Sequence, residues 1–443
     1  MIENTSHAVA AGLIFVIAYA LIASEKIHRT VVALAGAAAV LALRLVEQHV
    51  AFGTGHAGID WNVVFLLLGM MIIVTITRRT GVFQWLAIKS AKVARGEPVR
   101  VLILLSAVTA LLSAFLDNVT TVLFMAPVTL LIADGLGIKP MPLLIAQILA
   151  SNIGGTATLI GDPPNIMIGS AADLGFLSFI KHLMPVTLVI FAVFVPMCLW
   201  LFRGELKAPP DVHERMAEFD ESGAITDPSL CKRCIAVLLL TFVGFFAHEA
   251  LHLRPATIAM AGAALLLLLV KMEINELLHE IEWATLLFFV GLFIMVGGLI
   301  ETGIIGEIAR WLIARAKESP GGMAIALLWI SAVASGVIDN IPFVATVNPM
   351  LVELARGFAD NPEQLAAAHL QTKEMMPFWW SLALGACLGG NFTLIGASAN
   401  VVVAGIAERN GHPIGFVRYL KYGIPITFMT IMVSHVYIWL RYL

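Results

Sequence analysis

The chain has 443 residues, of which 59% are hydrophobic and 13% are charged, and its formal net charge is −3. Soluble domains are about 45–50% apolar and about 25% charged, so this composition predicts a polytopic membrane protein whose main partner is the lipid bilayer. The small net charge gives no argument for nucleic acid as a partner.

Apolar segments that could cross a bilayer, some only with their flanking residues, recur along the chain. The residues before the first segment include Glu3 and no Lys or Arg, so we expect this segment to persist as a helix and not to be a cleaved signal peptide. The predicted spans are Ala8–Ala23, Val31–Val46, Val63–Thr77, Pro185–Phe202, Ile235–Phe246, Ala256–Val270 and Leu286–Ile300.

Two further regions of the first half read as interrupted helices. Leu102–Leu116 and Val119–Ile132 are short apolar elements separated by Asp117 and Asn118, which favours a re-entrant hairpin with a polar tip. The stretch Leu143–Ser170 contains several glycines and two prolines near its middle, which predicts a broken spanning helix. Such breaks are tolerated at membrane depth only where they line a cavity or are buried in protein.

The motifs of the first half recur in the second half. Asp339 and Asn340 follow Asp117 and Asn118 by 222 positions. The glycine-rich stretch 154–165 is matched by 389–400, 235 positions later. Several collinear matches of this kind indicate an internal duplication.

The first half contains five predicted crossings and one hairpin, and an odd number of crossings inverts the second half relative to the first. The segment Arg78–Arg100 is rich in Lys and Arg and is therefore predicted to be cytoplasmic. We expect an all-α polytopic membrane protein with two inverted-topology repeats, each with about five transmembrane helices, a re-entrant hairpin and a broken helix. The predicted boundaries are 1–203 for the first repeat, 204–233 for a cytoplasmic linker and 234–443 for the second repeat.

Carboxylates at membrane depth are functional candidates, because burying an ionisable side chain there is costly. Asp117 and Asp339 stand between the hairpin arms, and Asp162 precedes Pro163 in the broken helix. The three are candidates for proton or ion coupling, and capping of the following helix is the alternative role for each, with a turn before Pro163 as a further alternative for Asp162. Asp162 has no equivalent in the second half, where Ala397 takes its place.

Asparagine and threonine side chains surround these acids in the sequence. Amides both donate and accept hydrogen bonds, which suits a hydroxylated neutral solute or an oxyanion. The candidate solute ligands are Asn118, Asn340, Asn165, Asn400, Thr120, Thr158 and Thr393. Bonding of the interrupted backbone is the alternative role, and for the threonines it is the favoured one.

Two sharper motifs carry less weight. His248, Glu249 and His252 match a zinc-protease pattern, but Pro255 follows at once and no third ligand is evident, so a polar loop is the favoured interpretation. Cys231 and Cys234 form one isolated pair, which is a weak indication of metal or metalloid binding. We therefore predict no enzyme activity, no catalytic residue, no metal site and no cofactor.

At these residues the sequence resembles the ArsB/NhaD permeases of the ion transporter superfamily, which include arsenite efflux permeases, NhaD-type sodium/proton antiporters and the P protein. The resemblance is carried by 113–121, 152–170, 337–349 and 389–400 and extends over nearly the whole chain. It implies an elevator-like movement in which the hairpins Leu102–Ile132 and Met323–Leu354, with the two broken helices, form the moving part. It also implies a homodimer.

Together, these features predict a multi-pass protein of the inner (plasma) membrane that exports arsenite or antimonite in exchange for protons. Sodium/proton antiport through the same carboxylates is the alternative. An intramembrane zinc protease is the remote alternative.

Overall fold

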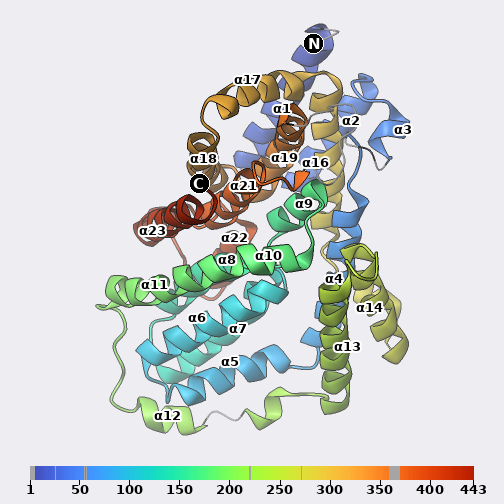
Figure 1. The fold of residues 1–443 in the computed structure, drawn as a ribbon. Helices are drawn as coiled ribbons and strands as arrows, with labels where there is room; N and C mark the ends of the chain where they lie inside the picture. Colours follow the sequence, from blue (N-terminus) through green and yellow to red (C-terminus); the bar gives the residue numbers. More distant parts are fainter. Residues whose placement is uncertain are drawn as a thin grey trace.

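The structure is a computed structural model that describes residues 5–24, 26–53, 55, 57–218, 221–270, 272–358 and 370–443. Within these ranges the regular secondary structure is helical throughout, and no strand is present. The helices form one assembly in which α17 and α5 lie near opposite ends (Figure 1). The predicted all-helical class is confirmed.

The two halves contain corresponding helices in the same order, except that the first half ends with two helices where the second ends with one, and a stretch with α12 (Val212–Glu218) and η1 (Ser222–Ala224) joins them. The first half contains α1 (Thr5–Ala23), α2 (Arg29–Ala42), α3 (Gln48–Ala51), α4 (Trp61–Arg78), α5 (Val82–Val93), α6 (Pro98–Phe115), α7 (Asn118–Leu136), α8 (Pro140–Gly155), α9 (Pro163–Ala172), α10 (Phe176–His182) and α11 (Met184–Phe202). The second half contains α13 (Pro228–Ala247), α14 (Pro255–Leu269), α15 (Ile274–Glu280), α16 (Trp283–Glu301), α17 (Ile304–Glu318), α18 (Pro320–Val337), α19 (Asn340–Phe358), α21 (Met376–Gly389), α22 (Ser398–Arg409) and α23 (Phe416–Tyr442).

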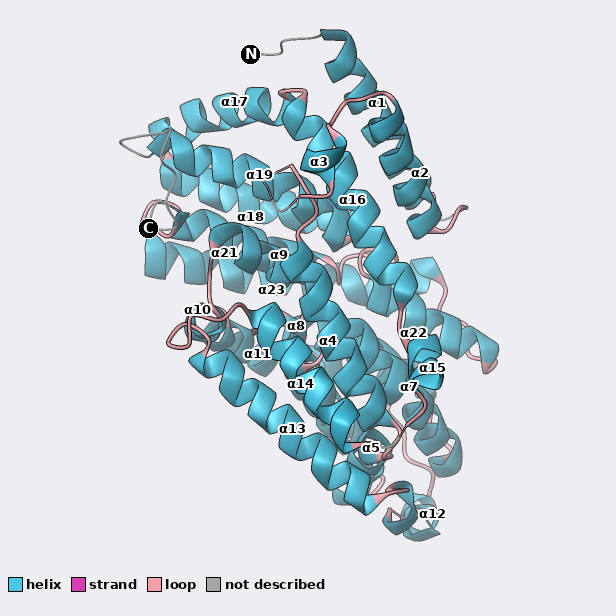
Figure 2. Cartoon of the chain, turned by 90° about the vertical axis from the view of Figure 1, so that its right-hand side faces the viewer, coloured by secondary structure: helices cyan, strands magenta, loops and turns pink. Residues whose placement is uncertain are grey.

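The halves pack through matching helix pairs, and Figure 2 shows α4 running beside α14 and α13. An added Cβ at Gly69 of α4 would lie 2.7 Å from the backbone of Ala259 in α14. An added Cβ at Gly291 of α16 would lie 2.7 Å from the backbone of Ala33 in α2. Small residues allow this close approach of backbones, which is a common way to pack helices in membranes. The duplication therefore reappears as two equivalent contacts between the halves.

Nine of the described helices are long and apolar enough to cross a membrane by length and composition. These nine include the hairpin arms α6, α7 and α18, which are 18, 19 and 18 residues long. The arms are thus longer than the short apolar runs predicted from the sequence. The sequence prediction starts the first arm at Leu102, whereas α6 starts at Pro98. Proline is tolerated in the first turn of a helix, because its missing N–H would have no partner there.

α13 begins at Pro228, within the stretch 204–233 that the sequence predicts as a linker, and Asp227 caps it. The Asp227 carboxylate accepts the N–H groups of Ser229 and Leu230, each at 2.9 Å. Cys231 and Cys234 therefore lie in the first two turns of a helix, and both side chains are buried.

Candidate functional site

Four helices begin at the motifs that the sequence repeats. α7 begins after Asp117, α9 after Asp162, α19 after Asp339 and α22 after Ala397. Each helix beginning carries the positive end of the helix dipole. Packing of α7 against α22 and of α19 against α9 brings helices from opposite halves together. The hairpins and broken helices thus meet in one central region, as predicted from the motif positions.

The hairpin arms are tied to the broken helices by hydroxyl groups at equivalent positions. Ser113 Oγ donates to Ser151 O at 2.6 Å, and Ser335 Oγ donates to Ala386 O at 2.6 Å. Thr158 Oγ1 donates to Ala114 O, and Thr393 Oγ1 donates to Gly336 O at 2.6 Å. These four contacts give hydrogen-bond donors to buried carbonyl groups of the interrupted backbone.

Asn165 and Asn400 brace the loops within the broken helices. Asn165 Nδ2 donates to Thr158 O at 2.8 Å and to Thr156 O at 3.2 Å. Asn400 Nδ2 donates to Gly390 O at 2.7 Å and to Thr393 O at 2.9 Å. The amide donors of both predicted solute ligands are therefore engaged by their own loops.

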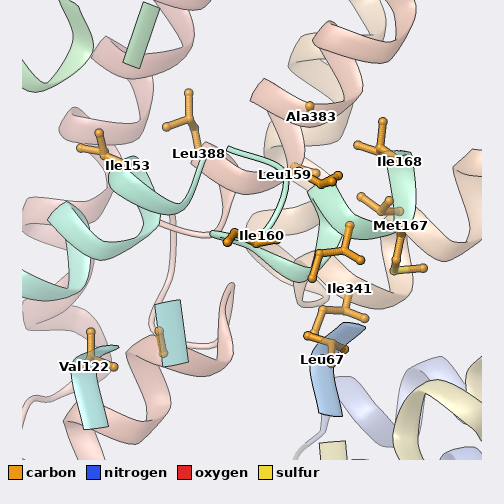
Figure 3. Packing of buried hydrophobic residues seen from close by; sticks show 14 of the residues in the cluster. Leu67, Val122, Ile153, Leu159, Ile160, Met167, Ile168, Ile341, Ala383 and Leu388 are labelled. Atoms are coloured by element: carbon orange, nitrogen blue, oxygen red, sulfur yellow. The ribbon is translucent and has the colours of Figure 1, made fainter. Parts of the chain in front are cut away.

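Apolar side chains pack around the first of these loops. Figure 3 shows Leu159 and Ile160 among residues of α8, α9 and α21, with Ile341 of the second hairpin nearby. Leu159 and Ile160 are 2% and 3% exposed, so the loop is enclosed by protein. A buried interruption of this kind needs internal partners for its backbone groups, which the Asn165 amide supplies.

A chain of amides crosses from the first hairpin to the second broken helix. Asn118 Nδ2 donates to Asn152 Oδ1 at 3.0 Å, and Asn152 Nδ2 donates to Oδ1 of Asn391 at 2.8 Å and of Asn400 at 2.9 Å. Asn391 Nδ2 then donates to Leu149 O at 3.2 Å. Along this chain Asn118 Oδ1 is the acceptor that receives no hydrogen bond from a described group. It is therefore available to a hydroxyl donor or a cation.

Asp162 lies at the crossing of the two halves and is fully buried. Asn340 Nδ2 lies 3.2 Å from Oδ1 and 3.3 Å from Oδ2 of this carboxylate. The thiol of Cys387 is a second close neighbour, and its Sγ donates to Asn165 Oδ1 at 3.4 Å. The side chain does not cap α9, so the predicted capping alternative does not describe this residue.

The two hairpin aspartates differ in their surroundings. Asp117 caps α7, and its Oδ1 accepts the N–H of Thr120 at 2.9 Å. Asp339 adopts a left-handed backbone, with φ of 67°, and its Oδ1 accepts the N–H of Ile341 at 3.2 Å. Its Oδ2 also pairs with Arg29 Nη1 at 3.0 Å. Capping occurs at both hairpins, and an ion pair is added at the second.

Four carboxylates of this region each lie within electrostatic range of at least one of the others. Asp162 interacts with Asp117 and with Asp339, while Glu282 interacts with Asp117 and with Arg29. Like charges at such range raise the free energy of the fully ionised state unless protons or cations are bound. A proton or cation bound in the central region would lower this free energy.

A cavity of about 1070 Å³ lies beside this region, between α4, α14 and α16 on one side and α9 and α19 on the other. Charged side chains at Asp60, Asp173, Arg254 and Glu353 line it together with Asn62 and Asn348. The hairpin aspartates and Asp162 are not among its lining residues. Met167 of α9 lines the cavity and lies two positions after Asn165 in the sequence, so the cavity reaches close to the broken helix.

The histidine motif does not form a zinc site. α13 ends at Ala247, so His248 and His252 do not occupy successive turns of one helix. His248 Nε2 accepts the N–H of Phe176 at 3.2 Å, which occupies one ligand nitrogen. Within the described residues no group of three or more His, Cys, Asp or Glu side chains is placed to hold a metal ion.

Sequence reasoning missed Arg29, Glu282, Ser398 and Cys387 as members of the central region. Arg29 stands out in the sequence as a cation next to an apolar run, but its contact with Asp339, 310 positions later, does not. Cys387 occupies the position equivalent to Asn152, 235 positions earlier, and both donate to the loop asparagine of the opposite half. That equivalence is readable from the alignment of the halves, whereas the contact is not.

Comparison with known proteins gives a family match over most of the chain. A family model described as CitMHS, citrate transporter, matches residues 19–385. An uncharacterized transporter of Mycobacterium tuberculosis is 47% identical over 438 residues, which cover 98% of each chain. The P protein of Homo sapiens is 34% identical over 498 aligned positions, which cover 95% of this chain and 58% of that protein. The predicted relationship to the P protein is therefore confirmed.

Two solved structures share the fold at low sequence identity. The Alcanivorax borkumensis YdaH transporter, described as having an unusual topology, is 12% identical with a TM-score of 0.58 and covers 97% of both chains. Neisseria gonorrhoeae MtrF, associated with a class of antimetabolite efflux pumps, is 13% identical with a TM-score of 0.58 and covers 98% of this chain and 95% of that one. Both likenesses concern the fold alone.

Proposed function

Because this chain belongs to the CitMHS citrate transporter family, a family of membrane transporters, we propose that it is a secondary active transporter whose coupling proton is carried by Asp162. The observation that carries the proposal is the fully buried Asp162 carboxylate, whose polar neighbours, the Asn340 amide and the Cys387 thiol, are both neutral. No Lys, Arg or His among the described residues forms an ion pair with it. A buried carboxylate without a cationic partner is costly, so binding of a proton or cation during the cycle would relieve this cost.

The solute that we propose is the neutral trihydroxide of arsenic or antimony, exported in exchange for protons. Two features favour an uncharged hydroxylated molecule: the carboxylates near Asp162 and the open acceptor at Asn118 Oδ1. Asn118 would accept a solute hydroxyl, and Asn340 would orient Asp162 beside it. Asn165 and Asn400 support this site through the loops and the amide chain.

Sodium/proton antiport is the second candidate, and the carboxylate cluster favours it. Asp117 and Asp162 are hard oxygen ligands within electrostatic range of each other, and Asn118 Oδ1 belongs to the same hairpin tip as Asp117. A sodium ion prefers such oxygen donors. In this case the cation would replace the proton at the same residues, and no second solute would be required.

Citrate, which the family description names, fits this central region less well. A citrate trianion would meet Asp117, Asp162, Asp339 and Glu282, while Arg29 is already paired with Asp339. The expected repulsion disfavours an anion with three charges. We therefore expect weaker transport of citrate than of either candidate above.

The proposed setting is the inner (plasma) membrane, with the chain assembled as a homodimer. The proposed movement is elevator-like, with the hairpins and broken helices moving against α1, α2, α4, α13, α14 and α16. The cavity between α4, α14 and α16 on one side and α9 and α19 on the other supports this division, because it separates the two groups of helices.

The decisive experiment is a substrate panel in proteoliposomes under an imposed proton gradient. Arsenite, antimonite, Na⁺ and citrate are compared in the wild-type protein, in Asp162→Asn and in Asp117→Asn. Proton-driven arsenite or antimonite flux that both variants abolish, with normal folding, supports the first candidate. Na⁺-dependent proton movement without arsenite flux supports the second, and gradient-driven flux that persists undiminished in Asp162→Asn contradicts the coupling role.

A further inference from the structure

The ion pair between Arg29 and Asp339 joins α2 to the tip of the second hairpin. Arg29 is the first residue of α2, which packs against α16, whereas Asp339 stands at the tip of the second hairpin. The Arg29 guanidinium also donates to Ser398 Oγ at the beginning of α22, and Ser398 Oγ donates to Asp339 Oδ2 at 3.1 Å. One cation thus contacts both the hairpin tip and the broken helix of the second half.

Two neighbouring contacts strengthen this junction. The Arg29 guanidinium lies 5.0 Å from the centre of the Phe288 ring in α16, a cation–π distance that favours one orientation of the side chain. Tyr19 of α1 donates its hydroxyl to Pro342 O, and this hydroxyl lies 2.8 Å from Thr346 Oγ1. Helices α1 and α2 therefore hold the beginning of α19 at two points.

The first hairpin lacks the corresponding cation. Gly291 packs on Ala33 and Gly69 packs on Ala259, so α2 and α14 are equivalent with an offset of 226 positions. This offset places Pro255, which has no charge, at the position equivalent to Arg29. Accordingly, Asp117 accepts the N–H of Thr120 but forms no ion pair with a described residue.

We infer that Arg29 is a positioning residue that neutralises Asp339 and fixes the tip of the second hairpin, so that Asp117 is the hairpin carboxylate left free for the coupling cation. This division between the two acids rests on the proposed coupling function. The fixing of the hairpin tip by Arg29 does not, because it follows from the contacts alone. An incoming cation would have to displace Arg29 to reach Asp339, but would meet no such competitor at Asp117.

Amide hydrogen exchange of the full-length protein in lipid nanodiscs tests the positioning role. In Arg29→Gln, exchange in residues 338–346 should become faster by on the order of tenfold, because a nearly buried charge pair is broken. Residues 116–124, the equivalent tip of the first hairpin, should keep their wild-type rate. Arg29→Lys should remain close to wild type, since the charge is retained.

A matched control and a double variant separate positioning from general destabilisation. Arg44→Gln removes an exposed cation from just beyond the other end of α2 and should leave both tips unchanged. The double variant Arg29→Gln/Asp339→Asn should exchange no faster than the faster single variant, because the two residues form one interaction. Equal acceleration at both tips, additive effects in the double variant, or an unchanged tip in Arg29→Gln would each overturn the positioning role.

Arsenite flux in proteoliposomes tests the division between the acids. Asp117→Asn should abolish proton-driven flux, and the double variant Arg29→Gln/Asp339→Asn should retain more flux than Asp339→Asn alone, because no unpaired Arg29 remains. Equal losses in all three variants contradict the division. Absence of arsenite flux in the wild type would count against the proposed solute, while the exchange experiment would still decide the role of Arg29.

Discussion

The two hairpins and the loops that they face share the same hydroxyl contacts but differ in their charged residues. The hydroxyl contacts of Ser113 and Thr158 in the first half are repeated by Ser335 and Thr393 in the second half. Asp117 and Asp339 occur in both halves, but the cation that pairs with Asp339 is not repeated, since Arg29 has Pro255 as its equivalent. Asp162 has Ala397 as its equivalent.

This contrast separates two tasks. The hydroxyl groups present in both halves donate hydrogen bonds to backbone carbonyl groups of the interrupted helices, because the same carbonyl groups are buried in each half. Arg29 and Asp162, each present in one half only, make the charges around the two hairpins unequal. Substitutions of the repeated glycines and loop asparagines should therefore affect folding in either half, and substitution of the unrepeated Asp162 should affect transport.

The largest expected effect is that of Asp162→Asn on transport. Loss of the proton-carrying group should reduce gradient-driven flux by on the order of 100-fold, since asparagine cannot exchange a proton. Proteoliposome flux measures the effect, and thermal unfolding checks that the variant folds. A variant with wild-type flux would show that Asp162 is not the coupling group. Ala397 is the position equivalent to Asp162, and an added Ala397→Asp substitution should not restore flux to Asp162→Asn.

Next in size is the effect of valine at the glycines where the hairpins contact the broken helices. A Cβ at Gly154 would lie 2.1 Å from Ala110 O, and a Cβ at Gly389 would lie 2.5 Å from Ala332 O. Backbone atoms cannot yield easily, so each variant should lose about 3 kcal/mol of stability. Size-exclusion profiles after heating measure the loss, and a large loss in one half with none in the other would break the proposed equivalence.

Alanine at the loop asparagines should have a smaller and similar effect in both halves. Asn165→Ala and Asn400→Ala each leave buried carbonyl groups without the amide donor, at a cost of about 1–3 kcal/mol. Thermal unfolding in detergent measures this cost. Loss of flux without loss of stability in either variant would instead assign that asparagine to solute contact.

The smallest expected effect is that of Cys387→Ser. The serine hydroxyl can donate to Asn165 Oδ1 as the thiol does, so flux should change by less than about twofold. Arsenite flux measures it, with Cys198→Ser, at a buried thiol of α11 outside the central region, as the matched control. A large loss confined to Cys387→Ser would give the thiol a direct part in solute binding.

Much of the architecture was readable from the sequence. The duplicated motifs, the apolar spans and the glycine and proline breaks predicted an all-helical protein with two related halves, a hairpin in each and a broken helix in each. These features depend on local chemistry, namely hydrophobic length and helix-breaking residues, which one chain displays directly. The candidates Asp117, Asp339 and Asp162 were found for the same reason, because an acid in an apolar context stands out.

The partners of those acids were decided only by tertiary structure. Arg29 meets Asp339 across 310 positions, Asn340 meets Asp162 across 178, and Asn152 meets Asn400 across 248. Nothing in local sequence specifies such pairings, because they arise where helices of opposite halves pack together. The sequence by itself determined which residues were duplicated, and the packing of the two halves decided that equivalent aspartates would have unequal surroundings.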